Sequence, residues 1–264
     1  MVPADTPADT EADTEEDLVD LSSNTALITG SSGGIGEEFA VQLAQRGVNL
    51  VLVARRADKL EELRKTLLER HPDIVIDVIT ADLATPGSGA QLAKKVRDLG
   101  RPIDILVNNA GVGLHAKFVG QDPDANAAQI QLNCGTLVDL TARFLPSMNE
   151  AGHGVVINVS STAGFQPTPG MAVYGATKAF VLSFSEALWQ ECKGTGVRVL
   201  ALCPGATETE FFARTGEEFL TDGRQTPNRW STPRSAHWTS PLRQSFPGGE
   251  TLYCRLDTGS CPAG

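Results

Sequence analysis

The sequence predicts an α/β fold in which a doubly wound parallel sheet is covered by helices on both faces. Short apolar runs rich in β-branched residues recur along the chain, and stretches with helical spacing of apolar residues separate them. Strands that alternate with helices imply right-handed crossovers, and these crossovers produce a parallel sheet with helices on both sides. No apolar run is long enough to span a bilayer, so the apolar segments are expected to form the core of the sheet.

The expected strands are short, apolar and mostly β-branched. They cover Thr25–Thr29, Asn49–Val53, Ile74–Ile79, Ile103–Val107, Val155–Val159 and Val197–Leu202. The segments between them carry apolar residues at helical spacing. These expected helices cover Gly36–Arg46, Ala57–Arg70, Gly89–Leu99, about Ala125–Met148 and about Ala172–Lys193.

Both ends of the chain depart from this alternation. The first twenty residues hold eight acidic side chains and no basic one, and such a segment cannot offset its ordering entropy. We therefore expect a disordered acidic tail over residues 1–22. After Gly223 the chain has no Val and no Ile, and its cations are all Arg, so residues 214–264 are predicted to be an atypical, poorly ordered segment without a seventh strand. Residues 23–213 remain as a single domain.

Charge and cysteine content exclude several classes of function. The net charge is -10, and without the eight N-terminal acids it is -10 + 8 = -2, which indicates no surface for nucleic acid or an anionic membrane. Five scattered cysteines, none in a C-x-x-C pair, indicate neither a metal site nor a disulfide framework. The N-terminus lacks the pattern of a secretory signal. We therefore expect a cytoplasmic protein that binds no metal, membrane or nucleic acid.

A glycine-rich turn joins the first expected strand to the first helix. Its sequence, Thr-Gly-Ser-Ser-Gly-Gly-Ile-Gly over residues 29–36, allows a tight turn and lets a pyrophosphate approach the helix N-terminus. Such a turn could be purely structural, but its position after the first strand favours a dinucleotide site of Rossmann type. The absence of a Gly-Lys-Ser/Thr ending argues against a nucleoside-triphosphate loop. The expected cofactor contacts here are Gly30, Ser32, Gly34, Ile35 and Gly36.

Two cations follow the second expected strand. Sites for NAD present an acidic residue there to the ribose hydroxyl, whereas this chain has Arg55 and Arg56. Guanidinium groups bind phosphate through paired hydrogen bonds, which favours the 2′-phosphate of NADP(H). The alternative is that both arginines only solvate the start of a helix.

Further polar residues lie where the other strands end. Asp82 is placed to bind the adenine amine, and Asn108–Gly111 follows the fourth strand, although asparagines in loops often serve only as turn formers. Ser161 follows the fifth strand and could donate to a substrate oxygen, with Ser160 as the neighbouring alternative. After the sixth strand, Pro204–Thr209 offers hydroxyls to a nicotinamide amide. The carboxyl ends of these strands meet at the edge where open α/β sheets bind ligands.

A tyrosine and a lysine four residues apart begin the last expected helix. Tyr174 and Lys178 therefore share one helix face. At an effective dielectric of ~20, a cation about 4 Å from a phenol lowers the pKa of the phenol by up to about three units, which suits general acid–base catalysis. Alone, such a pair is common on helix surfaces. Asn133 is unfavourable within a helix, so it is either exposed or holds a water for a proton relay.

In order and spacing, these motifs resemble those of the short-chain dehydrogenase/reductase family over roughly residues 23–213. The resemblance implies the strand order 3-2-1-4-5-6, a catalytic tetrad of Asn133, Ser161, Tyr174 and Lys178, and binding of the nicotinamide ribose by Lys178. It also implies a cofactor site formed by Gly30, Ser32, Gly34, Ile35, Gly36, Arg55, Arg56, Asp82, Leu83, Asn108, Asn109, Ala110, Gly111, Tyr174, Lys178, Pro204, Gly205, Thr207 and Thr209. The helix and the seventh strand that follow Thr209 in the family pattern are missing from this sequence.

We therefore expect a dinucleotide-binding catalytic domain that moves a hydride between NADP(H) and a small carbonyl or alcohol substrate, with Tyr174 as general acid or base. The resemblance also implies a homodimer formed through the helices at about 125–148 and 172–193. A serine hydrolase would need a G-x-S-x-G elbow, which Ser160 and Ser161 lack. A regulatory nucleotide-binding module would have no use for the Tyr174 and Lys178 pair. A catalytically impaired protein of the same fold, which binds nucleotide but turns over poorly, stays open.

Overall fold

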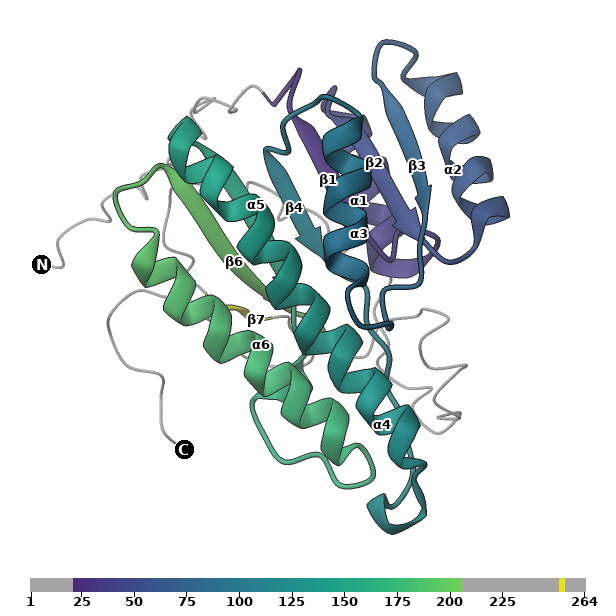
Figure 1. The fold of residues 1–264 in the computed structure, drawn as a ribbon, viewed down its shortest axis with the longest axis vertical. Coiled ribbons are helices and arrows are strands. Elements are labelled where there is room, and N and C mark those ends of the chain that lie inside the picture. Colours follow the sequence, from purple (N-terminus) through teal and green to yellow (C-terminus); the bar gives the residue numbers. More distant parts are fainter. Residues whose placement is uncertain (1–20, 206–251, 255–264) are drawn as a thin grey trace, which may run out of the picture.

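The sheet follows the predicted topology. The computed structural model describes residues 21–205 and 252–254 (Figure 1). Its strands are β1 (Thr25–Thr29), β2 (Asn49–Ala54), β3 (Ile76–Thr80), β4 (Ile105–Asn108), β5 (Gly154–Val159), β6 (Val197–Cys203) and β7 (Leu252–Cys254). They lie in the order β3-β2-β1-β4-β5-β6-β7, and the first six are parallel. The doubly wound fold class and the strand order are therefore confirmed.

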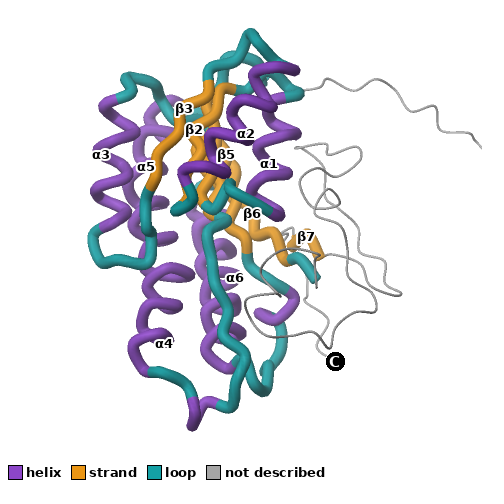
Figure 2. The backbone as a smooth tube through the Cα atoms, turned by 90° about the vertical axis from the view of Figure 1, so that its right-hand side faces the viewer, coloured by secondary structure: helices purple, strands orange, loops and turns teal. Residues whose placement is uncertain are grey.

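Helices cover both faces of the sheet. They are α1 (Gly34–Ala44), α2 (Ala57–Arg70), α3 (Ser88–Asp98), α4 (Pro123–Ile130), α5 (Leu137–Ala151) and α6 (Ala172–Glu191), together with short 3-10 turns at Phe118–Gly120 and Thr162–Gly164. Figure 2 shows α1 and α2 on one side of the strands and α3 and α5 on the other. Within the part of the chain that the structure describes, no helix is both long enough and apolar enough to cross a membrane.

The core explains why the strands read as continuous apolar runs. Ile28 and Leu52 pack with α1 and α2, whereas their neighbours Leu27 and Val51 pack with α3 and α5. Successive side chains of a strand point to opposite faces, and here both faces are covered by helices. Every residue of β1 is therefore buried.

The seventh strand is a correction to the sequence analysis, which placed no strand after β6. β7 pairs antiparallel with β6, with Leu202 opposite Tyr253 and Cys203 opposite Leu252. The outer edge of β6, which would be open without a seventh strand, is therefore paired along these residues. Three residues without Val or Ile give almost no periodic signal, so this strand depends on its partner rather than on its own sequence. Residues 1–20, 206–251 and 255–264, which include most of both predicted tail segments and the last eight residues of the predicted domain, lie outside the described residues.

The helix expected over about Ala125–Met148 is a continuous helical run, Pro123–Ala151, whose pitch changes near its middle. A π-helical segment, Gln131–Thr136, joins α4 to α5. Such a segment adds a residue to the turn and changes the direction of the side chains that follow it, and it often occurs at functional sites. Asn133 lies within it. Figure 1 shows α4 and α5 as one continuous rod beside α6.

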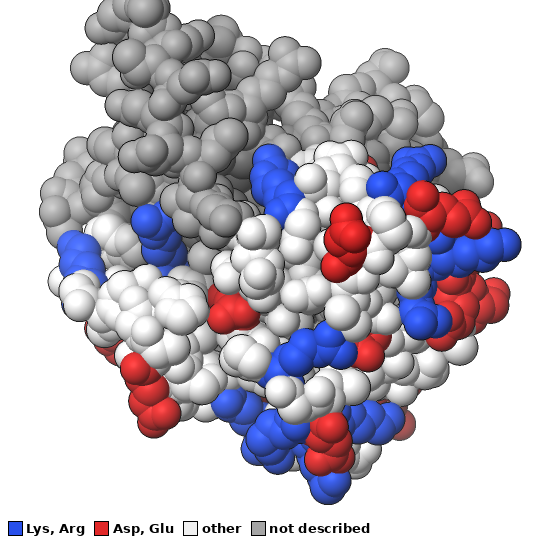
Figure 3. All heavy atoms as spheres, turned by 90° about the horizontal axis from the view of Figure 1, so that it is seen from above, with Lys and Arg blue, Asp and Glu red and all other residues white. Residues whose placement is uncertain are grey.

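Charges of both signs are interspersed on the surface. Figure 3 shows Lys and Arg side chains next to Asp and Glu side chains on one face of the molecule. Several exposed charges pair within helices, as in Lys59 with Glu62 at 2.9 Å and Lys94 with Asp98 at 2.8 Å. Exposed pairs of this kind contribute little to stability, because solvent screens their attraction.

Candidate active site

A cavity of about 720 Å³ lies at the carboxyl ends of the parallel strands. Most of the predicted site residues line it, from the glycine turn, the strand ends and the start of α6. They are Gly30, Ser32, Gly34, Ile35, Arg55, Arg56, Asp82, Leu83, Asn109, Ala110, Gly111, Ser161, Tyr174, Lys178, Pro204 and Gly205. Gly36, Asn108 and Asn133 are not among its lining residues, and Thr207 and Thr209 lie outside the described residues.

The glycine turn is held in place by Asn109. Its side-chain Nδ2 donates to the main-chain oxygens of Thr29 at 2.9 Å and Gly30 at 3.2 Å. A Cβ on Gly36 would collide with that same amide nitrogen and with the Gly30 oxygen. Gly36 therefore allows α1 to lie close to the glycine turn, and it does not line the cavity. Gly30 has a positive φ of 69°, a conformation that only glycine adopts at little cost.

The buried hydroxyl of Thr29 joins the ends of β1 and β4. It accepts from the main-chain nitrogens of Asn109 and Ala110, both at 3.0 Å. These bonds fix the loop after β4 against the glycine turn. Asn108 points elsewhere, because its Nδ2 donates inside the core to Thr141 at 3.0 Å and Asn158 at 2.9 Å. Of the two asparagines, only Asn109 takes part in the cavity wall.

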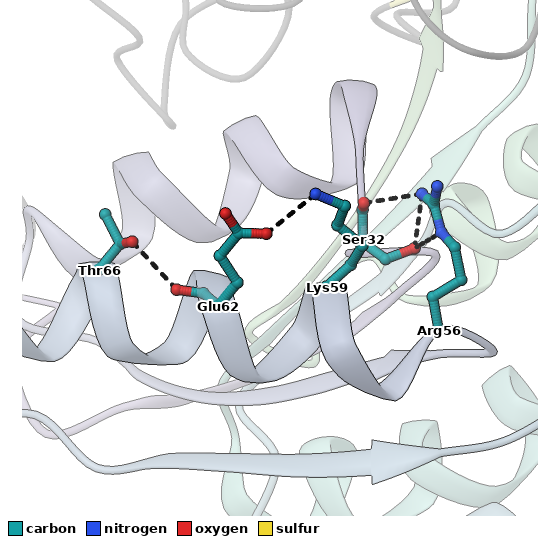
Figure 4. Close-up of polar contacts among 5 residues, drawn as sticks. All are labelled: Ser32, Arg56, Lys59, Glu62 and Thr66. Carbon is teal, nitrogen blue, oxygen red and sulfur yellow. Dashed lines mark hydrogen bonds and ion pairs between the residues drawn. The ribbon is translucent and has the colours of Figure 1, made fainter.

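Arg56 clamps the glycine turn from the side of β2. Its guanidinium donates to the main-chain oxygen of Ser32 at 2.8 Å and to the Ser32 hydroxyl at 3.1 and 3.3 Å. Figure 4 shows this guanidinium directed at Ser32, while the Lys59–Glu62 ion pair lies further along α2. Arg55 lines the same cavity and is exposed. A fixed cation and an exposed cation therefore flank one end of the cavity.

Lys178 is buried at the end of β5. Its side chain is only 5% exposed, and its Nζ donates to the Val159 oxygen at 2.8 Å. Nζ lies 5.6 Å from the centre of the Tyr174 ring, so the predicted i, i+4 pair does share one face. Burial lowers the pKa of Lys178 to about 8, while the nearby thiols of Cys134 and Cys203 act in the opposite direction. The buried amine therefore loses its proton more readily than an exposed lysine does.

The structure separates the two serines at the end of β5. Ser160 is buried, and its hydroxyl donates to the Lys178 main-chain oxygen at 2.7 Å, which ties β5 to α6. Ser161 is only partly buried; its hydroxyl donates a long bond to the Pro204 oxygen at 3.4 Å and accepts from the Ala163 nitrogen at 3.2 Å. Because the Ser160 hydroxyl has a short structural bond, Ser161 is the better placed donor for a ligand.

Asn133 is buried, so the alternative of an exposed Asn is wrong. It is 2% exposed; its Oδ1 accepts from the Val112 nitrogen at 3.0 Å, and its Nδ2 donates to the Val112 oxygen at 2.9 Å. Nδ2 also donates to the Thr177 hydroxyl at 3.0 Å. The side chain therefore joins the loop after β4 to α6, beside Lys178, and contacts no cavity directly. The feature of the sequence that pointed to Asn133 was an asparagine at a position expected to be helical, where this residue type is unfavourable.

One wall of the cavity, formed by the helical run of α4 and the π-helical segment, was not predicted from the sequence. Ala125, Ala128, Gln129 and Leu132 line the cavity at positions i, i+3, i+4 and i+7, which is the spacing of one helix face. Met171 and other residues of the segment that precedes α6 line the same cavity. The helical spacing was visible in the sequence, but only the packing of α4 against α6 shows what that face meets.

Comparison with known proteins agrees with this arrangement. A family model described as short chain dehydrogenase matches residues 24–219. An uncharacterized oxidoreductase of Staphylococcus saprophyticus is 36% identical over 193 residues, which cover 73% of this chain and 82% of the relative. A short-chain dehydrogenase from Sphingobium yanoikuyae in complex with NADPH superposes with a TM-score of 0.75 at 37% identity, covering 79% of this chain and 81% of that one. A bulky-bulky ketone specific alcohol dehydrogenase from Comamonas testosteroni gives 0.70 at 37% identity, with 78% of each chain covered.

Proposed function

The chain belongs to the short-chain dehydrogenase/reductase family, a family of oxidoreductases, and we propose that it transfers a hydride between NADP(H) and a carbonyl or alcohol substrate. One observation carries the proposal: Ser161, Tyr174 and Lys178 line the same cavity as the glycine turn. A hydroxyl, a phenol and a buried amine thus converge beside a site with the backbone freedom that a pyrophosphate requires.

The proposed chemistry assigns one task to each side chain. The nicotinamide group supplies or accepts the hydride when it is bound. In reduction, the Tyr174 hydroxyl gives its proton to the carbonyl oxygen, and Ser161 donates a hydrogen bond to the same oxygen as negative charge develops on it. The Lys178 ammonium stabilises the phenolate that remains on Tyr174, because the two groups share one face at the end of β5. Oxidation of an alcohol reverses these steps.

The preference for NADP(H) rests on Arg55 and Arg56. Both line the cavity where β2 ends, and among the described lining residues at that end they are the cations. Arg56 is already fixed on Ser32, so we assign the closer contact with the 2′-phosphate to the exposed Arg55. The Sphingobium relative, whose structure contains NADPH, supports the same choice. Gly30 and Gly34, with φ of 69° and 61°, would admit the pyrophosphate.

We also propose a homodimer built on the helical run and α6. Ile130 on α4 and Phe180 on α6 are large apolar side chains that are 50% and 44% exposed. Phe180 stacks on Phe184 with ring centroids 5.9 Å apart, so two aromatic rings lie together on α6. Exposed apolar residues on two adjacent helices are typical of a protein–protein interface.

The test is oxidation of NADPH by the purified full chain, followed by absorbance, against a panel of aldehydes, ketones and quinones. Turnover that requires a carbonyl compound, and that is faster with NADPH than with NADH, is the expected result. Tight NADPH binding without turnover on any member of the panel would favour the alternative of a nucleotide-binding protein with impaired catalysis. Absence of both binding and turnover would overturn the proposal.

A further inference from the structure

Gln129 is a buried amide without a hydrogen-bond partner in the described part of the chain. It lies near the end of α4, is 0% exposed, and neither its Oε1 nor its Nε2 has a partner there. Burying an unpaired amide costs about 1–3 kcal/mol, and nearly all buried polar groups in proteins are therefore paired. Gln129 is also one of the residues that line the cavity, so a ligand bound there is the natural candidate for the partner of its amide.

The helix geometry places Gln129 beside the proposed catalytic groups. α5 and α6 each precede a parallel strand of the same sheet and cover the same face, so the helical run and α6 are parallel, as Figure 1 shows. Asn133 contacts Thr177 across these two helices. One turn earlier on both helices, Gln129 lies level with the first turn of α6, which carries Tyr174. Both residues line the same cavity.

The described cavity residues on the helix face of Gln129 are apolar and uncharged. They are Ala125, Ala128 and Leu132, and the apolar Met171, just before α6, lines the same cavity. The charged residues among the described lining residues are Arg55, Arg56, Asp82 and Lys178. The first three lie at the nucleotide end, and the Lys178 amine is bonded to Val159. An anionic substrate group beside Gln129 would therefore be buried without a counter-charge.

We propose that Gln129 is a substrate-binding residue that selects carbonyl compounds carrying a second, uncharged hydrogen-bonding group, such as a hydroxyl. A primary amide offers both a donor and an acceptor, so it can bind a hydroxyl through either of its atoms. This inference rests on the proposed function, since it concerns the substrate of that same cavity. The inference adds the class of substrate to the proposed function. Such substrates are neutral and largely apolar, and they carry one polar group at a distance from the reacting carbonyl.

The experiment compares three aromatic ketones of similar size: para-(hydroxymethyl)acetophenone, para-ethylacetophenone and para-acetylbenzoate. The wild-type chain should have the highest kcat/KM with the hydroxymethyl ketone and the lowest with the carboxylate. In Gln129→Met, which keeps the size but not the hydrogen bonds, the preference for hydroxymethyl over ethyl should fall about tenfold, mainly through KM. An unchanged ratio in this variant would overturn the proposal.

Asn126→Leu is the matched control. Asn126 is also a buried amide of α4 with an unpaired Oδ1, but it does not line the cavity. Its substitution should leave the ratio between the two neutral ketones unchanged. If Asn126→Leu alters the ratio as much as Gln129→Met, the effect comes from the helix as a whole and the proposal is wrong.

Two further measurements separate ligand binding from structural support and from the proposed chemistry. Since the Gln129 amide has no partner in the described chain, Gln129→Met should melt at the same or a higher temperature, and a clear loss of stability would indicate a structural role and overturn the inference. Calorimetric titration of the NADP-saturated wild type with the same ketones tests binding, because the oxidised cofactor cannot reduce a ketone; absorbance of the same samples checks that the hydroxymethyl group forms no NADPH. Tighter binding of the hydroxymethyl ketone in this titration, together with no oxidation of NADPH by any of the three ketones in the kinetic assay, would support the assignment of Gln129 and contradict hydride transfer. Equal affinities would overturn the assignment.

Discussion

Nζ of Lys178 donates to the main-chain oxygen of Val159 at 2.8 Å, so a side chain of α6 is fixed by the last residue of β5. Ser160, the next residue, returns a bond from its hydroxyl to the Lys178 main-chain oxygen. This reciprocal pair joins the strand end to the helix that carries Tyr174. The position of the Lys178 amine therefore follows from the packing of α6 on the sheet. No bound ligand is required to orient this amine.

Replacing Tyr174 with Phe should abolish turnover while leaving the affinity for NADPH unchanged. The ring stays in the cavity, and only the transferable proton is lost, which for a general acid corresponds to about 10²–10⁴-fold in kcat. Steady-state kinetics with any active ketone, together with a titration of NADPH, would measure both effects. Lys178→Met should reduce both. Retention of most of the kcat by the Phe variant would exclude Tyr174 as the proton donor.

The buried amine should make stability depend on alkaline pH. The pKa of Lys178 is about 8 in the folded chain against an ordinary value of 10.5, so below pH 8 the lysine is charged in both states and its burial costs the full penalty. Between pH 8 and 10.5 the unfolded chain binds more protons than the folded chain, so this contribution to stability rises with pH. Relative to Lys178→Met, the wild type should gain on the order of 3 kcal/mol across this range. Denaturant melts of both proteins at several pH values test it, and a constant difference would contradict the assigned burial.

Arg55 and Arg56 should differ in their effect on cofactor choice. Arg55→Ala removes an exposed cation, so it should weaken NADPH binding about tenfold or more and leave NADH binding nearly unchanged. Arg56→Ala also releases the glycine turn from its bonds to Ser32, so it should weaken both cofactors. Titration of each variant with NADPH and NADH distinguishes the two roles. An equal loss for both cofactors in Arg55→Ala would argue against recognition of the 2′-phosphate.

Gly36 should not tolerate even a methyl group. A Cβ at this position would overlap the Asn109 amide and the Gly30 oxygen, and overpacking of this kind costs about 1–3 kcal/mol. Gly36→Ala should therefore lower the melting temperature and weaken binding of both cofactors. Gly120→Ala serves as the control, because a Cβ there has no atom within 4 Å. Comparable melting temperatures for the two variants would contradict the tight packing of α1 on the turn.

The proposed dimer predicts that a charge on α6 separates the subunits. Phe180→Glu places a carboxylate in the expected interface, and it should shift the protein from dimer to monomer in light scattering. Val75→Glu is the control, since Val75 is also 44% exposed but lies just before β3, far along the sheet from α6. If the wild type is a monomer, or if Phe180→Glu remains a dimer, the proposed interface is wrong.

The sequence was most informative where local pattern and tertiary structure agree. β-branched runs such as Val155–Val159 predicted strands to within a residue or two, because strands buried on both faces must be apolar throughout. The burial of Asn133 could not be predicted from the sequence. Its burial depends on a π-helical segment and on a main-chain partner at Val112, which no periodicity encodes. Gln129 was missed for a related reason, since an unpaired amide is recognisable only when its neighbours are known.

The pairing of β7 with β6 also has a consequence for the newly made chain. Residues 204–251 separate the two strands, so the ribosome completes all six parallel strands well before Leu252 emerges. Contacts of high sequence separation form late, because closing a long loop is entropically costly. During translation the nascent sheet therefore passes through an interval in which the outer edge of β6 at Ala201–Cys203, the edge away from β5, faces no partner strand, and in that interval this edge can mispair with another copy of the chain.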